Sequence, residues 1–142
     1  MEINNYQLKA ARTCAQIDGN ILDDIHMVLG MQTEVAEIAD VYKKAIAYKK
    51  TLDLVNVKEE LGDVMWYIAN LCNMHGWDLR DILATNIAKL EARYPEKFTE
   101  ENALNRNLEH EREILEQNSK GVQTLTSHVE FAITNQSRTD EV

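Results

Sequence analysis

The sequence predicts an all-helical protein, a bundle of four to five helices. Across four long segments the apolar residues recur every three or four positions, which is the spacing of an amphipathic helix. Nowhere do valine, isoleucine and threonine alternate with polar residues over the length of a strand. Glycine occurs five times and proline once in 142 residues, so few positions break a helix.

The first two helices are expected over 4–17 and from residue 22 or 23 to 48. Asp18-Gly19-Asn20 separates them, because glycine and asparagine suit the turn that follows a helix. On the second helix we expect one apolar stripe to pack in the core. It consists of Ile25, Val28, Leu29, Val35, Ile38, Ala39, Tyr42 and Ile46. Glu34, Glu37, Val41 and Lys44 form an adjoining stripe beside that core.

A third helix is expected over 54–74 and a fourth from 78 to the residues before Pro95. His75-Gly76 ends the third helix, and Pro95 cannot continue the fourth. We interpret residues 98–105 as a docking segment and residues 104–117 as a short charged helix. We therefore expect one domain over 1–117. Residues 118–142 are rich in Ser, Thr, Asn and Gln with little periodicity, which indicates a flexible C-terminal tail.

The charge balance limits the partners of the chain. Fifteen Lys and Arg against 24 Asp and Glu give a formal charge of −9, which disfavours duplex nucleic acid and anionic lipid. No apolar run is long enough to span a membrane, and the N-terminus has no signal-peptide pattern. Cys14 and Cys72 have neither disulfide-framework nor zinc-site spacing. We expect a cytoplasmic protein that binds neither duplex nucleic acid nor membrane.

Two pairs of carboxylates carry the functional prediction. Glu34 and Glu37 lie on the second helix, and Glu60 and Asp63 on the third, each pair about one helical turn apart on one face. Four acids that share a small volume repel one another, and a cation between them removes that repulsion. Because hard divalent ions prefer oxygen ligands, we expect these four residues to bind Mg2+, with Mn2+ as a possible substitute.

Other interpretations of the acids remain open at this point. A single ExxE pair more often faces water, and the second pair makes the two readings about equally probable. A di-iron bundle would carry Glu-x-x-His, whereas Glu37 and Asp63 stand at the third position after the first acid. The four histidines show no common ligand spacing.

The fourth helix carries a candidate phosphate-binding stripe. Asn86, Lys89 and Arg93 stand at i, i+3 and i+7, so that one amide and two cations share one side of the helix. The competing interpretation is an ion-paired face, in which Lys89 and Arg93 pair with nearby acids. Because the four acids are also present, we favour phosphate binding.

Taken together, these residues resemble the MazG-like all-alpha NTP pyrophosphohydrolase superfamily, whose signature is an ExxE helix followed by ExxD on the next helix. The sequence shows Glu34-x-x-Glu37, then Glu60-x-x-Asp63, then Asn86-x-x-Lys89-x-x-x-Arg93-Tyr94-Pro95 and Phe98. Leu29-Gly30 before the first pair and Lys43-Lys44 after it are also similar. Thr33 stands where many relatives carry an additional acid. The likeness covers about 22–107.

The resemblance implies hydrolysis of a nucleoside or deoxynucleoside triphosphate between the alpha and beta phosphates, giving the monophosphate and pyrophosphate. It implies that the four acids hold Mg2+ and that Lys89 and Arg93 steady the polyphosphate, with Asn86 as an orienting hydrogen-bond donor. One acid, with Glu37 as a candidate, accepts the proton of the attacking water. The substrate could also be another pyrophosphate-linked compound at the same metal site.

The alternative from another class is a non-catalytic helical assembly module whose acid stripes serve recognition or solubility. In either case, helices as amphipathic as these often finish burying their apolar faces against another copy. We expect a homodimer or a homotetramer, in which oligomerisation completes the helical bundle.

Overall fold

The computed structural model describes residues 1–15, 17 and 21–118, and over these residues all the regular secondary structure is α-helix. The chain divides into two compact units, Met1–Ile82 and Leu83–Val142, each of which is described by itself. We call them the first unit and the second unit. The predicted all-helical class is confirmed. The flexible tail predicted for 118–142 lies, apart from Asn118 at the end of a helix, outside the described residues.

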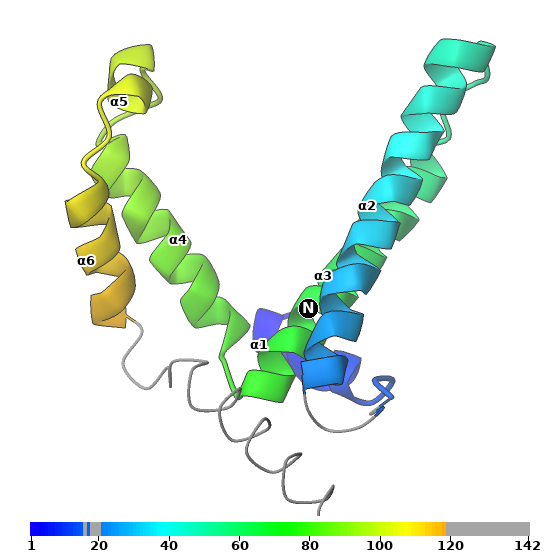
Figure 1. Cartoon of the computed structure of the whole chain (residues 1–142), viewed down its shortest axis with the longest axis horizontal. Coiled ribbons are helices and arrows are strands. Elements are labelled where there is room, and N and C mark those ends of the chain that lie inside the picture. Colours follow the sequence, from blue (N-terminus) through cyan, green and yellow to red (C-terminus); the bar gives the residue numbers. More distant parts are fainter. Residues whose placement is uncertain (16, 18–20, 119–142) are drawn as a thin grey trace, which may run out of the picture. The chain divides into compact units, whose positions relative to one another are not determined.

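In the first unit, two long helices run side by side, α2 (Ile21–Tyr48) and α3 (Leu54–His75) (Figure 1). They are antiparallel, because Asp24 near the start of α2 pairs with His75 at the end of α3, 3.1 Å apart. A shorter helix, α1 (Ile3–Ala11), packs on α3. A small core consists of Ala10 on α1, Ala69 and Cys72 on α3, and Leu79 at the start of α4 (Leu79–Arg93).

Local sequence explains the limits of α3. The side chain of Asp53 accepts hydrogen bonds from the backbone N–H groups of Val55 and Asn56, both at 3.1 Å, and so caps the start of the helix. Gly76 ends it in the left-handed conformation, with φ at 65°, which glycine adopts without a Cβ penalty. Both ends of α3 were therefore predictable, and the expected limits are confirmed to within a residue.

The first helix ends earlier than predicted. We expected it to continue to Ile17, but α1 ends at Ala11. The hydroxyl of Thr13 donates to the carbonyl of Ala10 and accepts a 2.7 Å hydrogen bond from the indole of Trp66 on α3. A short polar side chain that bonds its own backbone competes with the helix, and here a tertiary partner holds it in place.

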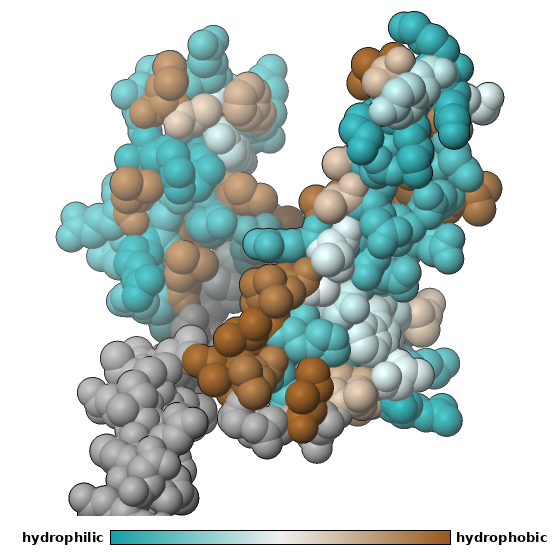
Figure 2. All heavy atoms as spheres, turned by 45° about the vertical axis from the view of Figure 1, so that its right-hand side comes forward, coloured by the Kyte–Doolittle hydropathy of each residue, from teal (hydrophilic) through white to brown (hydrophobic). Residues whose placement is uncertain are grey.

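The apolar stripe predicted for the core of α2 does not pack against α3. Val28, Val35 and Tyr42 recur every seven residues, and each is more than 40 % exposed. The residues of α2 that are buried are Asp23, Met27, Gly30 and Val41, which share the side that carries the two glutamates. The acid stripe, and not the apolar one, therefore faces α3. Apolar side chains are visible at the surface in Figure 2.

The second unit contains the greater part of α4 (Leu79–Arg93), the short helix α5 (Glu100–Leu104) and α6 (Leu108–Asn118). The predicted fourth helix is confirmed, and the expected docking segment contains α5. Thr99 caps α5 through its hydroxyl, which accepts from the N–H of Asn102. The predicted charged helix begins later than expected, because Asn107 caps it by accepting from the N–H of His110 at 3.0 Å.

Candidate metal centre

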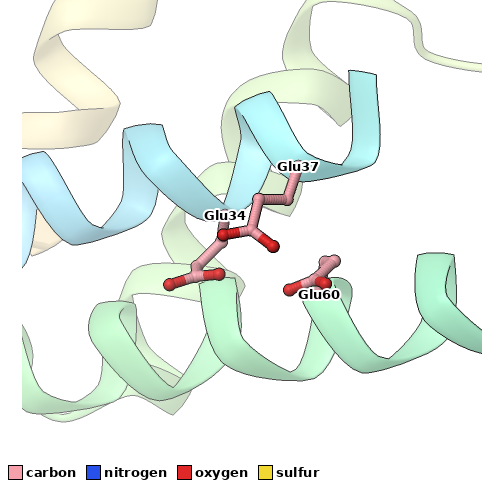
Figure 3. A group of neighbouring side chains, drawn as sticks. All are labelled: Glu34, Glu37 and Glu60. Carbon is pink, nitrogen blue, oxygen red and sulfur yellow. The ribbon is translucent and has the colours of Figure 1, made fainter. Parts of the chain in front are cut away.

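Three carboxylates converge between α2 and α3. Glu34 and Glu37 project from α2 and Glu60 from α3, and each offers an oxygen that lies within 4.8 Å of the others (Figure 3). Glu60 is buried, Glu34 is half-buried and Glu37 is exposed. The cluster therefore has one side inside the helix pair and one side open to solvent, as a site for an ion that also contacts a substrate requires.

A glycine lets the two helices approach closely beside these acids. Gly30 is one turn before Glu34, and a Cβ at this position would overlap the ring of Tyr67, which is one turn after Asp63 on α3. Met27, the next buried residue of α2 toward its N-terminus, is completely buried. Gly30 and Tyr67 together thus set the spacing of the helices that holds the carboxylates within reach of one another.

Asn56 fixes the orientation of the buried acid. Its side-chain amide donates to Oε1 of Glu60 at 2.5 Å, from a position one turn earlier on α3. Because Asn56 is itself in the first turn after the Asp53 cap, the orientation of Glu60 depends on the start of the helix. Asn56 was not among the predicted site residues, although its i, i+4 relation to Glu60 is visible in the sequence.

Within the described residues the cluster has no ion-paired cation, although Lys44 is near enough that Glu37, after Asp40, contributes to the raised pKa of its ammonium group. Burial, a hydrogen bond with Glu60 and the negative charges of Glu37, Glu60 and Asp63 raise the pKa of Glu34. In the described part of the chain, no lysine or arginine forms an ion pair with Glu34, Glu37 or Glu60. A carboxyl group whose pKa is raised by neighbouring negative charges marks a place that favours the binding of a positive charge.

Asp63, the fourth predicted acid, lies one turn beyond Glu60 on α3 and is exposed. It is not one of the three residues whose oxygens lie within 4.8 Å. Its charge nevertheless contributes to the raised pKa of Glu34 and, after burial, to the raised pKa of the Tyr6 phenol. Asp63 therefore borders the cluster, on the side where α1 approaches.

Tyr6 is a neighbour of the site that the sequence did not indicate. Its hydroxyl donates to the carbonyl oxygen of Gly62 at 3.3 Å, across 56 residues of chain. No local pattern predicts this contact, because only the packing of α1 on α3 creates it.

The donor set fits a hard divalent cation. All three converging ligands are carboxylate oxygens, which suit Mg2+, Mn2+ or Ca2+. Neither histidine nor cysteine joins the group among the residues that the structure describes, so the softer N/S sites typical of zinc are not represented there.

The three residues of the predicted phosphate stripe lie on α4, in the second unit. Asn86 is exposed and Lys89 half-buried, and neither forms an ion pair within the described ranges. Arg93 instead donates from Nε and Nη2 to the two carboxylate oxygens of Glu111 on α6, at 2.9 and 2.5 Å. This ion pair is the alternative that the sequence left open for Arg93, and its partner comes from 18 residues away.

Glu111 also accepts from a second arginine. Arg106 donates from Nη2 to Oε2 at 2.7 Å and from Nε to Oε1 at 3.3 Å. The two guanidinium groups lower the pKa of Glu111 to about 2. A cavity of about 210 Å³ opens beside these three side chains, lined also by three asparagines and His110.

The helix pair and its carboxylates define the class of the protein: an all-helical chain with a carboxylate cluster, a candidate cation site, between two antiparallel helices. A family model of the MazG nucleotide pyrophosphohydrolase domain matches residues 24–98, which include all seven predicted site residues. The chain belongs to this family, as the sequence motifs predicted.

One curated relative supports the same grouping. The Gene 37 protein of Mycobacterium phage L5 is 31 % identical over 101 residues, which are 66 % of this chain and 89 % of the phage protein. No solved structure matches the chain.

In the described part of the chain, no helix is both long enough and apolar enough to cross a membrane.

Proposed function

We propose that the chain is an Mg2+-dependent pyrophosphohydrolase that cleaves a nucleoside or deoxynucleoside triphosphate between its alpha and beta phosphates. The observation that carries this proposal is the convergence of Glu34, Glu37 and Glu60 without a compensating cation, in a chain of the MazG family. Hydrolysis at the alpha phosphorus gives the nucleoside monophosphate and pyrophosphate.

The residues of the cluster have different tasks in this proposal. Glu60, buried and oriented by Asn56, and the half-buried Glu34 hold the cation against the helix pair. Asp63 extends the ligand set on the side of α1. When bound, Mg2+ supplies Lewis-acid polarisation of the phosphate oxygens and offsets the charge that develops on them.

Glu37 is the candidate general base. It is the most open of the three converging carboxylates, so that an attacking water can reach it from solvent. A carboxylate within hydrogen-bond distance of this water accepts its proton as the water attacks the alpha phosphorus, and pyrophosphate leaves.

Asn86 and Lys89 are proposed to contact the polyphosphate, and Arg93 is retained as a third candidate. Neither Asn86 nor Lys89 forms an ion pair within the described part of the chain, whereas Arg93 would have to share its guanidinium with Glu111. Lys89→Ala should raise KM or lower kcat. If neither changes, Lys89 is only a surface cation.

A second copy of the chain is proposed to complete the bundle as a homodimer or homotetramer. The stripe of Val28, Val35 and Tyr42 on α2 is exposed in the single chain, and burial of such a stripe is a common driving force for association. Light scattering coupled to size exclusion measures the mass of the assembly. A monomeric mass at micromolar concentration would contradict this part of the proposal.

The test of the reaction is a screen of the common NTPs and dNTPs with full-length protein and Mg2+. We expect at least one triphosphate to yield monophosphate and pyrophosphate, and EDTA to abolish the reaction, with Mn2+ restoring it at least in part. Turnover in ¹⁸O-labelled water should place the label in the monophosphate if water attacks the alpha phosphorus. Release of orthophosphate and the nucleoside diphosphate contradicts the proposed position of cleavage. No turnover of any member contradicts the proposal and favours a non-catalytic assembly module.

A further inference from the structure

A cavity of about 340 Å³ lies in the first unit, where the end of α1 meets the second half of α3. Its lining residues are Ala11, Cys14, Asn70, Asn73 and Met74. The early end of α1 creates it, because the chain turns away after Ala11 and Thr13 is tied to the indole of Trp66. None of its lining residues belongs to the carboxylate cluster.

The cavity lies along the face of α3 that carries Asp63, which borders the carboxylate cluster. Asn70 and Met74 follow Asp63 by 7 and 11 residues, and at 3.6 residues per turn all three positions project to nearly the same side. The axial rise from Asp63 to Asn70 is about 10 Å. A nucleoside monophosphate is of comparable length, so a nucleotide held by its phosphates at the acids can reach the cavity with its base.

Between the carboxylate cluster and the cavity, α3 carries aromatic side chains suited to contact with a nucleoside. Trp66 and Tyr67 are half-buried and stand edge to face, 4.9 Å between ring centroids, in the turn between Asp63 and Asn70. On the other side, α1 borders both ends of the path, because Tyr6 lies beside Asp63 and Ala11 lines the cavity.

Asn70 has unused hydrogen-bonding capacity in the cavity wall. Its side chain is only 1 % exposed; Nδ2 donates to the carbonyl of Trp66 at 3.0 Å, and Oδ1 accepts from Asn73 at 3.4 Å. A carboxamide has two N–H donors and two acceptor lone pairs, so these bonds leave one of each.

The neighbours of Asn70 hold it in place. Asn73 donates to the backbone carbonyl of Gln7 at 3.0 Å and accepts from the Gln7 side chain at 2.9 Å, which locks it between α1 and α3. Ala11 and Met74 add apolar surface against which the face of a flat ring can pack.

We propose that this cavity binds the nucleobase of the substrate, and that the amide of Asn70 contacts the hydrogen-bonding edge of the base. An amide that offers a donor and an acceptor together is the group with which asparagine and glutamine contact base edges in other settings. The inference rests on the proposed function, since it assigns base recognition to the same nucleotide whose phosphates lie at the acids. It makes Asn70 a specificity-determining residue, held by Asn73 and Gln7.

The first test measures binding without turnover. Full-length ¹⁵N-labelled protein with Mg2+ is titrated with the common nucleoside monophosphates, which are products of the reaction and are not hydrolysed, and, separately, with pyrophosphate, while the side-chain amide resonances of Asn70 and Asn73 are followed. We expect at least one monophosphate to shift these resonances and pyrophosphate to leave them in place. Unchanged resonances with every monophosphate at millimolar concentration overturn the inference, whether or not the protein hydrolyses triphosphates.

The second test fills the cavity. Cys14→Phe places a large ring in the lining of the cavity, and Leu8→Phe places the same ring on α1 at a residue that is 72 % exposed and does not line the cavity. We expect Cys14→Phe to raise KM for the preferred triphosphate at least about tenfold, and Leu8→Phe to leave it unchanged. Equal KM values in both variants and wild type overturn the inference.

Asn70→Asp then tests the contact itself, because it replaces the N–H donor with an acceptor in nearly the same shape. The ratio of kcat/KM between the best and second-best triphosphate should change by about tenfold. Thermal unfolding of this variant shows whether it folds, and if it does not, the Cys14→Phe comparison still decides. If the screen detects no pyrophosphate with any triphosphate but the monophosphates still shift Asn70, the proposed reaction fails and the base site stands.

Discussion

Glutamates in the two units of this chain have opposite electrostatic surroundings. In the first unit, Glu34, Glu37 and Glu60 converge without an ion pair to any described lysine or arginine, and the pKa of Glu34 is raised. In the second unit, Glu111 accepts from two arginines, and its pKa is lowered to about 2. The comparison shows that a buried carboxylate can either remain without a paired cation or form ion pairs with basic residues of the same chain. The first arrangement suits a binding site, and the second suits a structural lock between α4 and α6.

Loss of one carboxylate from the first unit should have the largest effect. Glu37→Gln is expected to lower kcat/KM by at least about 100-fold, because it removes charge directed at the cation. The melting temperature in EDTA should stay the same or rise, since the change relieves repulsion. Steady-state kinetics and circular dichroism measure the two quantities.

The matched control is Glu59→Gln, which neutralises an exposed acid that is adjacent to Glu60 and outside the cluster. Its activity should remain close to that of the wild type. Asp63→Asn should lower kcat/KM to a similar extent as Glu37→Gln. Full activity of both Glu37→Gln and Asp63→Asn at saturating Mg2+ would remove the metal centre from the mechanism.

Loss of the carboxylate in the second unit should instead reduce stability. Glu111→Ala leaves Arg93 and Arg106 facing each other without their common acceptor, and removal of one partner of a buried pair is strongly destabilising. We expect the melting temperature to fall by several degrees. Glu116→Ala, which breaks the exposed Arg112–Glu116 pair, should leave it unchanged. Equal melting temperatures for the two variants would show that the ion pairs of Glu111 do not stabilise the contact between α4 and α6.

A smaller effect is expected where the two helices approach each other. Gly30→Ala places a Cβ in the ring of Tyr67, so that the helices must separate and the acids spread. We expect a loss of about 1–3 kcal/mol in the free energy of unfolding, together with weaker Mg2+ binding measured by calorimetry.

Gly62→Ala is the matched control for this substitution, because nothing lies within 4 Å of a Cβ at that position. A glycine in a helix interior costs about 0.5–1 kcal/mol relative to alanine, so this variant should be slightly more stable. The double variant Gly30→Ala with Tyr67→Ala should recover part of the lost Mg2+ affinity. Unchanged affinity in Gly30→Ala alone would mean that the close approach does not position the acids.

The smallest effect concerns pH. Because the folded-state pKa of Glu111 is about 2 and its ordinary value is 4.5, its ion pairs stabilise the fold above about pH 4.5, and this contribution disappears as the pH falls toward 2. Wild type and Glu111→Gln should therefore differ in stability at pH 6 and differ by a much smaller amount at pH 2.5. Urea unfolding at both values measures this difference. A constant difference across the range would exclude Glu111 as its source.

Much of the fold was predictable because its determinants are local. The caps and breakers Asp53, Gly76 and Pro95 set helix limits that the structure confirms, and the spacing within ExxE and ExxD places each pair on one helix face. The end of α1 was not predictable, because Thr13 leaves the helix to meet Trp66 from a distant segment. The partner of Arg93 could not be chosen either, since Glu111 competes with several nearer acids for it.

The sequence by itself determined the helical class, the family and the residues that carry the acids, because periodicity, capping and motif spacing are properties of short segments. Only the tertiary structure decided which side of α2 faces α3. The apolar stripe and the acid stripe are both compatible with a helix, and the close contact of Gly30 with Tyr67 selects the acid stripe. That choice brings Glu34 and Glu37 to Glu60, and with it forms the candidate metal centre.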